Sequence, residues 1–160
     1  MAQDTWSHDG GTEVEVSGLI EQICATSDIE GLTILGGEPF LQAEALGLLA
    51  ESAKKNNLSV VTFTGFTLQE LEDDTSQATR RLLNATDLLI DGPFDESQYD
   101  LSRPWVGSSN QQYNFLSSRY SFDDIGRIGN KIEIRISKQG TILANGMGQF
   151  GKLREAVVGD

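Results

Sequence analysis

A carboxylate follows two glycines at the end of a short apolar run, Leu-Thr-Ile-Leu-Gly-Gly-Glu-Pro, at residues 32–39. Glycine has no Cβ, so Gly36 and Gly37 allow a ligand to approach the main chain closely. Glu38 would add negative charge beside that ligand, and Pro39 suits the first turn of a helix, where its missing N–H is not needed. The pattern favours a turn that binds a cationic ligand. A tight strand-to-helix turn with a solvated glutamate is the alternative.

Two further turns of unusual composition follow runs that are typical of strands. Thr-Gly-Phe-Thr occupies residues 64–67, and Asp-Gly-Pro-Phe occupies residues 91–94. The carboxyl ends of parallel strands meet at one edge of a sheet, and ligands of α/β proteins bind beyond that edge. Three such turns at successive strand ends therefore predict a cleft, although each alone would be an ordinary turn.

The elements that must position these turns alternate between helices and strands. Apolar residues at helical spacing predict helices, one of them started by a capping box of Thr67 and Glu70, and short β-rich runs predict strands. The expected helices cover residues 16–25, 41–55, 68–72 and 76–83, and the expected strands cover 32–35, 58–63, 87–91, 131–136 and 141–143. The alternation predicts an α/β fold with a parallel sheet and a C-terminal β-hairpin that turns at residues 138–140.

Three details of this arrangement are open to test. The apolar face of the second helix is expected to contain Leu41, Ala45, Leu48, Leu49 and Ser52. Residues 92–112 lack periodicity, and a loop of that length is usually functional or mobile. Residues 113–116, Tyr-Asn-Phe-Leu, are expected to pack in the core, with a strip that faces a partner as the alternative.

Length and charge narrow the class of protein. The chain has 160 residues and 38% hydrophobic content, which suits one globular domain over residues 1–160. Its formal net charge of -12 opposes general affinity for nucleic acid or anionic membranes. No apolar run reaches the roughly 20 residues that cross a bilayer, and the polar N-terminus has no apolar signal region, so a cytoplasmic location is expected.

The cysteine content limits metal chemistry. Cys24 is the single cysteine of the chain and lies in a run with helical, apolar spacing, so it is expected to be a small core residue. One thiol forms no internal disulfide, and it cannot hold an iron–sulfur cluster, which needs several thiolates.

The chain resembles a known family at this point. Residues 32–42, 62–71, 87–94 and 105–111 look, in order, like the radical SAM activases of glycyl radical enzymes. Within that family the likeness is greatest to the group that activates anaerobic ribonucleoside-triphosphate reductase and to its single-cluster relatives. Gly-Gly-Glu-Pro alone is moderately specific, whereas its combination with Thr-Gly-Phe-Thr, Asp-Gly-Pro-Phe and Gly-Ser-Ser-Asn-Gln is highly specific.

The resemblance implies a fold, a reaction and partners. The family fold is a partial (βα) barrel of the radical SAM type. Its reaction is the reductive cleavage of S-adenosylmethionine at a [4Fe–4S] cluster, after which a hydrogen atom is removed from a glycine of a partner enzyme. The implied partners are a glycyl radical enzyme, such as anaerobic ribonucleotide reductase, and an electron donor such as flavodoxin or ferredoxin.

The resemblance also implies a binding site for S-adenosylmethionine. The implied residues are Gly36, Gly37, Glu38, Pro39, Thr64, Gly65, Phe66, Asp91, Gly92, Ser109 and Asn110. Of these, residues 36–39 would receive the methionine ammonium group, and Asp91 is the best-placed polar group of its strand end. Ser109 and Asn110 would face the ligand or the partner from the long loop.

The chain departs from the family in its cluster ligands. The family holds its cluster with a Cys-x3-Cys-x2-Cys loop near the N-terminus, and this chain has no such loop. Residues 2–6 match the segment that directly follows the third cysteine, so an N-terminally truncated barrel without its first strand is expected. A family derivative that has lost its cluster and serves as a non-catalytic module for binding S-adenosylmethionine or a partner is the alternative. In either case the chain as written is expected to be inactive alone.

Overall fold

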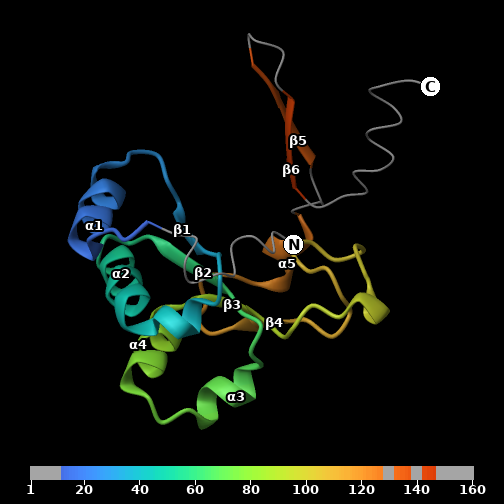
Figure 1. Ribbon diagram of the computed structural model, residues 1–160, viewed down its shortest axis with the longest axis horizontal. Coiled ribbons are helices and arrows are strands. Elements are labelled where there is room, and N and C mark those ends of the chain that lie inside the picture. Colours follow the sequence, from blue (N-terminus) through green and yellow to red (C-terminus); the bar gives the residue numbers. More distant parts are fainter. Residues whose placement is uncertain (1–11, 128–131, 138–141, 147–160) are drawn as a thin grey trace. The chain divides into compact units, whose positions relative to one another are not determined.

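The computed structural model describes residues 12–127, 132–137 and 142–146 (Figure 1). Residues 2–6, which resemble the segment after the third cysteine of the family, and the expected hairpin turn at residues 138–140 lie outside these residues. The chain divides into two compact units. The first, here called the sheet unit, contains the described residues up to Phe94 and residues 110–121; the second, here called the loop unit, contains residues 95–109 and the described residues from Phe122 onward.

The sheet unit is built on four strands in the order β1-β2-β3-β4. They are β1 (Gly31–Ile34), β2 (Ser59–Phe63), β3 (Leu88–Asp91) and β4 (Gln112–Phe115). The pairs β1–β2 and β2–β3 are parallel, whereas β4 runs antiparallel to β3. The α/β class and the parallel arrangement of the first three strands are confirmed, and β4 is a strand that the sequence patterns did not predict.

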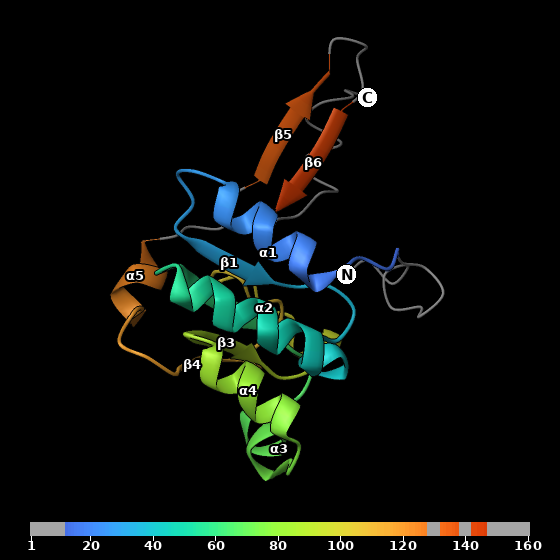
Figure 2. The ribbon, with the colours of Figure 1, turned by 90° about the vertical axis from the view of Figure 1, so that its left-hand side faces the viewer.

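Helices gather on one face of the sheet, and those that follow β1 connect its parallel strands (Figure 2). They are α1 (Val16–Ala25), α2 (Ala43–Lys55), which follows the short 3-10 helix η2 (Pro39–Gln42), α3 (Leu68–Asp73) and α4 (Gln77–Ala85). Thr67 and Glu70 form the expected capping box at the start of α3. The bounds of the four α-helices agree with the sequence-based ones to within two residues at every end. None of the described helices is both long and apolar enough to cross a membrane.

The core of the sheet unit lies between the helices and one face of the strands. Side chains alternate along a strand, so Val60 of β2 and Leu89 of β3 point to this face. The buried cluster consists of Ile34, Phe40, Ala43, Ala50, Ala53, Val60, Leu71, Leu82, Ala85 and Leu89. This packed core fixes the positions of the strands and therefore of the residues at their ends.

The buried face of α2 differs from the expected one. Leu41 and Leu48 are 64% and 43% exposed, whereas Gly47 and Ala50 are buried. A Cβ added at Gly47 would stand 2.9 Å from the Arg81 side chain of α4. The prediction for Leu41 and Leu48 was wrong because small residues, which permit close approach of two helices, form the contact with α4 in place of large ones.

Among the described residues, the loop unit holds one short 3-10 helix, one short α-helix and two strands. It contains η3 (Glu96–Gln98), α5 (Phe122–Gly126) and the antiparallel pair β5 (Ile132–Ile136) and β6 (Ile142–Gly146), which confirms the two strands of the expected hairpin. Residues 95–109 form a compact loop, because Asp100 N–H donates to the Gly107 carbonyl and Ser109 N–H donates to the Gln98 carbonyl.

Candidate functional site at the carboxyl edge of the sheet

Glu38 links the end of β1 to the end of β2. Its Oε1 accepts hydrogen bonds from Thr64 Oγ1 at 2.7 Å and from Phe40 N at 3.0 Å. Its Oε2 accepts a hydrogen bond from Gly65 N at 2.9 Å. Glu38 is also the N-cap of η2, and Pro39 stands in the first turn of that helix, as the sequence predicted. The Glu38 carboxylate thus accepts hydrogen bonds from three groups of the protein and links the two turns.

The turn after β2 has its main-chain donors fully occupied. Five consecutive N–H groups, those of residues 64–68, donate in turn to Ile90 O, Glu38 Oε2, Thr64 Oγ1, Glu70 Oε2 and Asp91 Oδ2. An anionic group needs free donors, and this turn has none to offer. The turn is therefore suited to a ligand that donates hydrogen bonds.

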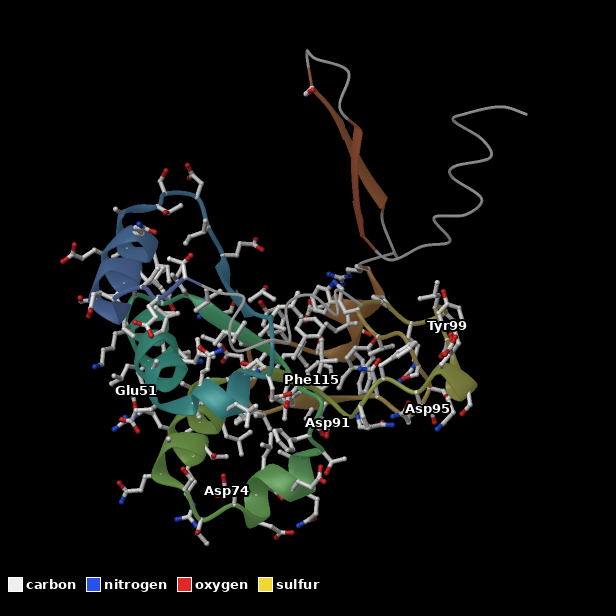
Figure 3. The ribbon with its side chains drawn as sticks, in the orientation of Figure 1. Glu51, Asp74, Asp91, Asp95, Tyr99 and Phe115 are labelled. Atoms are coloured by element: carbon white, nitrogen blue, oxygen red, sulfur yellow. The ribbon has the colours of Figure 1, made fainter. Side chains whose placement is uncertain are left out.

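Asp91, at the end of β3 and labelled in Figure 3, binds the same turn. Its Oδ2 accepts from Leu68 N at 2.6 Å, at the start of α3. The residue is 5% exposed, and its Oδ1 has no hydrogen-bond partner among the described residues. A buried carboxylate oxygen without a donor is costly, so a bound donor is the natural complement of this atom.

Gly92, directly after β3, makes a second hydrogen bond to the turn after β2. Its N–H donates to the Phe66 carbonyl at 2.9 Å, and its φ of 97° lies in the region that favours glycine. Asn110 donates from Nδ2 to the Pro93 carbonyl at 2.7 Å, while its Oδ1 is a second buried acceptor without a partner among the described residues. Acceptors therefore predominate around the end of β3.

The three predicted turns converge, although not every predicted residue joins them. Hydrogen bonds tie Glu38, Thr64, Gly65, Phe66, Asp91 and Gly92 into one network. Gly36, with a φ of 143°, and Gly37 are exposed at the end of β1, and a Cβ at Gly36 would meet nothing within 4 Å. Ser109 belongs to the loop unit, where its hydroxyl donates to Gln98.

Two members of the network were absent from the sequence-based set. Phe40 and Leu68 take part through their main-chain N–H groups, which no side-chain motif reveals. The position of each just after a predicted strand-to-helix turn is the signal that points to them, because the first N–H groups of a helix need acceptors from outside it.

The described residues hold no group of three or more His, Cys, Asp or Glu side chains arranged for a metal ion. Cys24 is exposed near the end of α1, and α1 has no buried residue. The expectation that Cys24 packs in the core was therefore wrong, since this helix covers the sheet unit only with half-buried side chains. The residues present do not fit a [4Fe–4S] cluster, which requires several thiolates.

An open hollow of about 390 Å³ lies far from this network, at the amino edge of the strands. It is lined by Ile29, Glu30, Asn57, Ser59, Arg119 and Tyr120. Its polar groups bond to one another, as Arg119 does to Asn57 and Tyr120 does to Ser59. We place the candidate site at the carboxyl edge, where acceptors lack partners.

Comparison with known proteins identifies the family of this chain. The sequence profile of the family described as "4Fe-4S single cluster domain" matches residues 1–114, which include β1, β2 and β3 with their three turns. The chain belongs to the 4Fe-4S single cluster domain family. The expected kinship with the activating proteins of anaerobic ribonucleotide reductase is likewise confirmed by the curated relatives.

Three relatives of this single cluster domain are named anaerobic ribonucleoside-triphosphate reductase-activating proteins. The protein of Pasteurella multocida is 39% identical over 87 residues, which cover 51% of this chain and 53% of the relative. Those of Haemophilus influenzae and Vibrio cholerae are 32% and 34% identical over 117 residues, which cover 68% of this chain and 73% of each relative. The first match thus spans about half the length of its relative. The search of solved structures gave no significant match.

Proposed function

We propose that this chain is the S-adenosylmethionine-binding part of an activase that generates a glycyl radical on an anaerobic ribonucleotide reductase. The observation that carries the proposal is the match over 117 residues to proteins named as activators of that reductase. A cytoplasmic location and an electron donor such as flavodoxin or ferredoxin belong to the same proposal.

The proposed fold for this activity is part of a radical SAM (βα) barrel. Three parallel strands in sequential order, with helices on one face, are the arrangement that such a barrel repeats. Active sites of (βα) barrels lie at the carboxyl ends of the strands, which is where Glu38, Thr64 and Asp91 converge.

S-adenosylmethionine fits the acceptors at this edge. The ligand carries an ammonium and a sulfonium group, both positively charged. Asp91 Oδ1 and Asn110 Oδ1 are buried acceptors without partners among the described residues, and the exposed Gly36 leaves the main chain accessible. In the activase reaction, S-adenosylmethionine supplies the adenosyl group that removes the hydrogen atom. The chain's own residues would bind and orient it.

The cluster cannot be assigned to residues of this chain. Cys24 is the one cysteine in the 160 residues, and it is exposed on α1. We therefore propose that the chain as given is inactive alone. The same observation favours one alternative function, a non-catalytic module that binds S-adenosylmethionine or a partner protein.

Isothermal titration of the 160-residue chain with S-adenosylmethionine tests the proposal. We expect saturable binding, weaker binding of S-adenosylhomocysteine, which lacks the sulfonium charge, and no binding of ATP, whose phosphates need free donors. A folded chain that binds none of the three, or that prefers ATP, would contradict it.

The choice between the activase and the module needs protein from its own cells. Intact mass and iron content, measured anaerobically, separate them. A mass above 17.4 kDa with iron and sulfide bound would support the activase, whereas a mass that equals this chain without iron would support the module.

A further inference from the structure

Glu38 has most of its acceptor capacity engaged by the protein. A carboxylate offers about four lone-pair sites, and three of them accept from Thr64 Oγ1, Gly65 N and Phe40 N. All three distances lie between 2.7 and 3.0 Å, the normal range for good hydrogen bonds. Only about one lone-pair site of Glu38 is therefore left for a ligand ammonium group.

The contacts of Glu38 reach two residues along the turn. Thr64 Oγ1 donates to Glu38 and accepts from Phe66 N at 3.1 Å, so the carboxylate fixes the hydroxyl that in turn fixes the next amide. The other half of the turn is held without Glu38, since Leu68 N donates to Asp91 and the Phe66 carbonyl accepts from Gly92. The turn after β2 is thus clamped from β1 on one side and from β3 on the other.

We propose that Glu38 is a positioning residue, which holds Thr64 and Gly65 in place for the ligand and does not bind the ligand itself. The inference rests on the proposed function for its ligand. Its structural part, the clamp from β1 onto the turn after β2, stands without a ligand. The sequence alone suggested the opposite, because a carboxylate after two glycines suits a cationic ligand.

Amide hydrogen exchange of the unliganded chain, followed by NMR, tests the clamp. Glutamine has one acceptor oxygen and one donor NH₂ group where glutamate has two acceptor oxygens. The orientation that keeps both bonds at the Oε1 position, from Thr64 Oγ1 and Phe40 N, turns the NH₂ group toward Gly65 N, whose bond is then lost. A hydrogen bond to a charged group contributes about 1.5–3 kcal/mol, so we expect the Gly65 amide to exchange roughly 10-fold faster or more. The Leu68 amide, held by Asp91, is expected to change less than about 2-fold, since distant sites act independently.

Glu70→Gln is the matched control. Glu70 is a carboxylate of the same turn, its bonds go to Thr67, and glutamine serves equally in a capping box. Gly65 exchange is expected to stay unchanged in this variant. Unchanged Gly65 exchange in a folded Glu38→Gln protein would overturn the proposal.

Thr64→Val provides a second variant, which leaves the Glu38 carboxylate in place but removes the hydroxyl that it orients. We expect Phe66 exchange to rise in Thr64→Val. The Kd for S-adenosylmethionine is expected to rise in both single variants and to be no higher in the double variant than in Glu38→Gln, because the Thr64 hydroxyl is oriented by its contact with Glu38. Weaker binding in Glu38→Gln with normal binding in Thr64→Val would mean that Glu38 contacts the ligand, and would overturn the proposal. If the unaltered chain does not bind S-adenosylmethionine, the proposed function is wrong. The Gly65 exchange rate in Glu38→Gln would still test whether Glu38 holds the turn after β2.

Discussion

Lys54, in the last turn of α2, forms an ion pair with Asp87, which lies just before β3 and is completely buried. Asp87 also accepts from Val60 N at 2.9 Å and from the Ser117 hydroxyl. Burial alone would raise the pKa of Asp87, but the hydrogen bonds from Lys54, Ser117 and Val60 outweigh it and hold the pKa below its ordinary value. One carboxylate thus joins α2, β2, β3 and the segment after β4.

Acid is expected to weaken the sheet unit through Asp87. Because the pKa of Asp87 is lower in the folded chain, its contribution is present above the ordinary pKa of about 3.9 and is lost as the pH falls through the lower folded value. Asp87→Asn is expected to lower stability at pH 7 by about 1–3 kcal/mol and to flatten its dependence on pH below about 4. Urea unfolding between pH 7 and 2.5 measures both. If the free energy of unfolding depended on pH below about 4 equally in the unaltered chain and in Asp87→Asn, Asp87 would not be the group responsible.

The close approach of β1 to β2 predicts that residue 31 must be glycine. A Cβ at Gly31 would stand 2.0 Å from Ser59 Oγ and 2.6 Å from the Ser59 carbonyl oxygen. We expect Gly31→Ala to destabilise the chain by about 1–3 kcal/mol, as other overpacked substitutions do. Because the second clash is with backbone, Ser59→Ala is not expected to rescue it.

Gly18→Ala is the control for that substitution. Gly18 lies inside α1, and an added Cβ would meet nothing within 4 Å. Alanine is the better helix former by about 0.5–1 kcal/mol, so the melting temperature is expected to rise slightly. A loss of stability in Gly18→Ala as large as in Gly31→Ala would show that the contact with Ser59 is not the cause.

Cys24 is expected to react with a thiol reagent in the folded chain. The side chain is exposed on α1, so a chromogenic disulfide reagent should modify one thiol per chain at a rate close to that in denaturant. Modification should leave the melting temperature within about 1 °C, because α1 buries no residue. A thiol that reacts only after unfolding would restore the original expectation of a core cysteine.

The capping box at α3 gives a local measure of helix stability. Thr67 accepts from Glu70 N at 3.3 Å, and Glu70 accepts from Thr67 N at 2.7 Å, which lowers the pKa of Glu70. Thr67→Ala is expected to cost about 1 kcal/mol, and Thr67→Ser much less, since serine caps equally well. Thermal unfolding followed by circular dichroism checks the difference, and equal losses in the two variants would argue against the cap.

The sequence predicted the parts of the fold that depend on local patterns. The ends of α1 and the cap of α3 follow from apolar spacing and from Thr67 with Glu70, both of which act within one turn. It missed β4, because Gln112–Phe115 is short and mixed in polarity and becomes a strand only by pairing with β3.

The convergence of the three turns was predicted, but the hydrogen bonds within them were not. Successive strand ends brought Glu38, Thr64 and Asp91 to one edge, as expected for parallel strands. Which atoms these carboxylates engage depends on main-chain N–H groups of neighbouring elements, such as those of Gly65 and Leu68, and no sequence pattern encodes those distances.

The one-sided pairing of β1 has a practical consequence for anyone who handles this protein. Among the described residues β1 pairs with β2 alone, and Leu35, just beyond it, is 71% exposed. A strand with open N–H and C=O groups can pair with another copy of itself, so self-association would grow with protein concentration. Binding and exchange data for this chain are therefore best compared across a dilution series, where an intramolecular property stays constant and an edge-to-edge contact disappears.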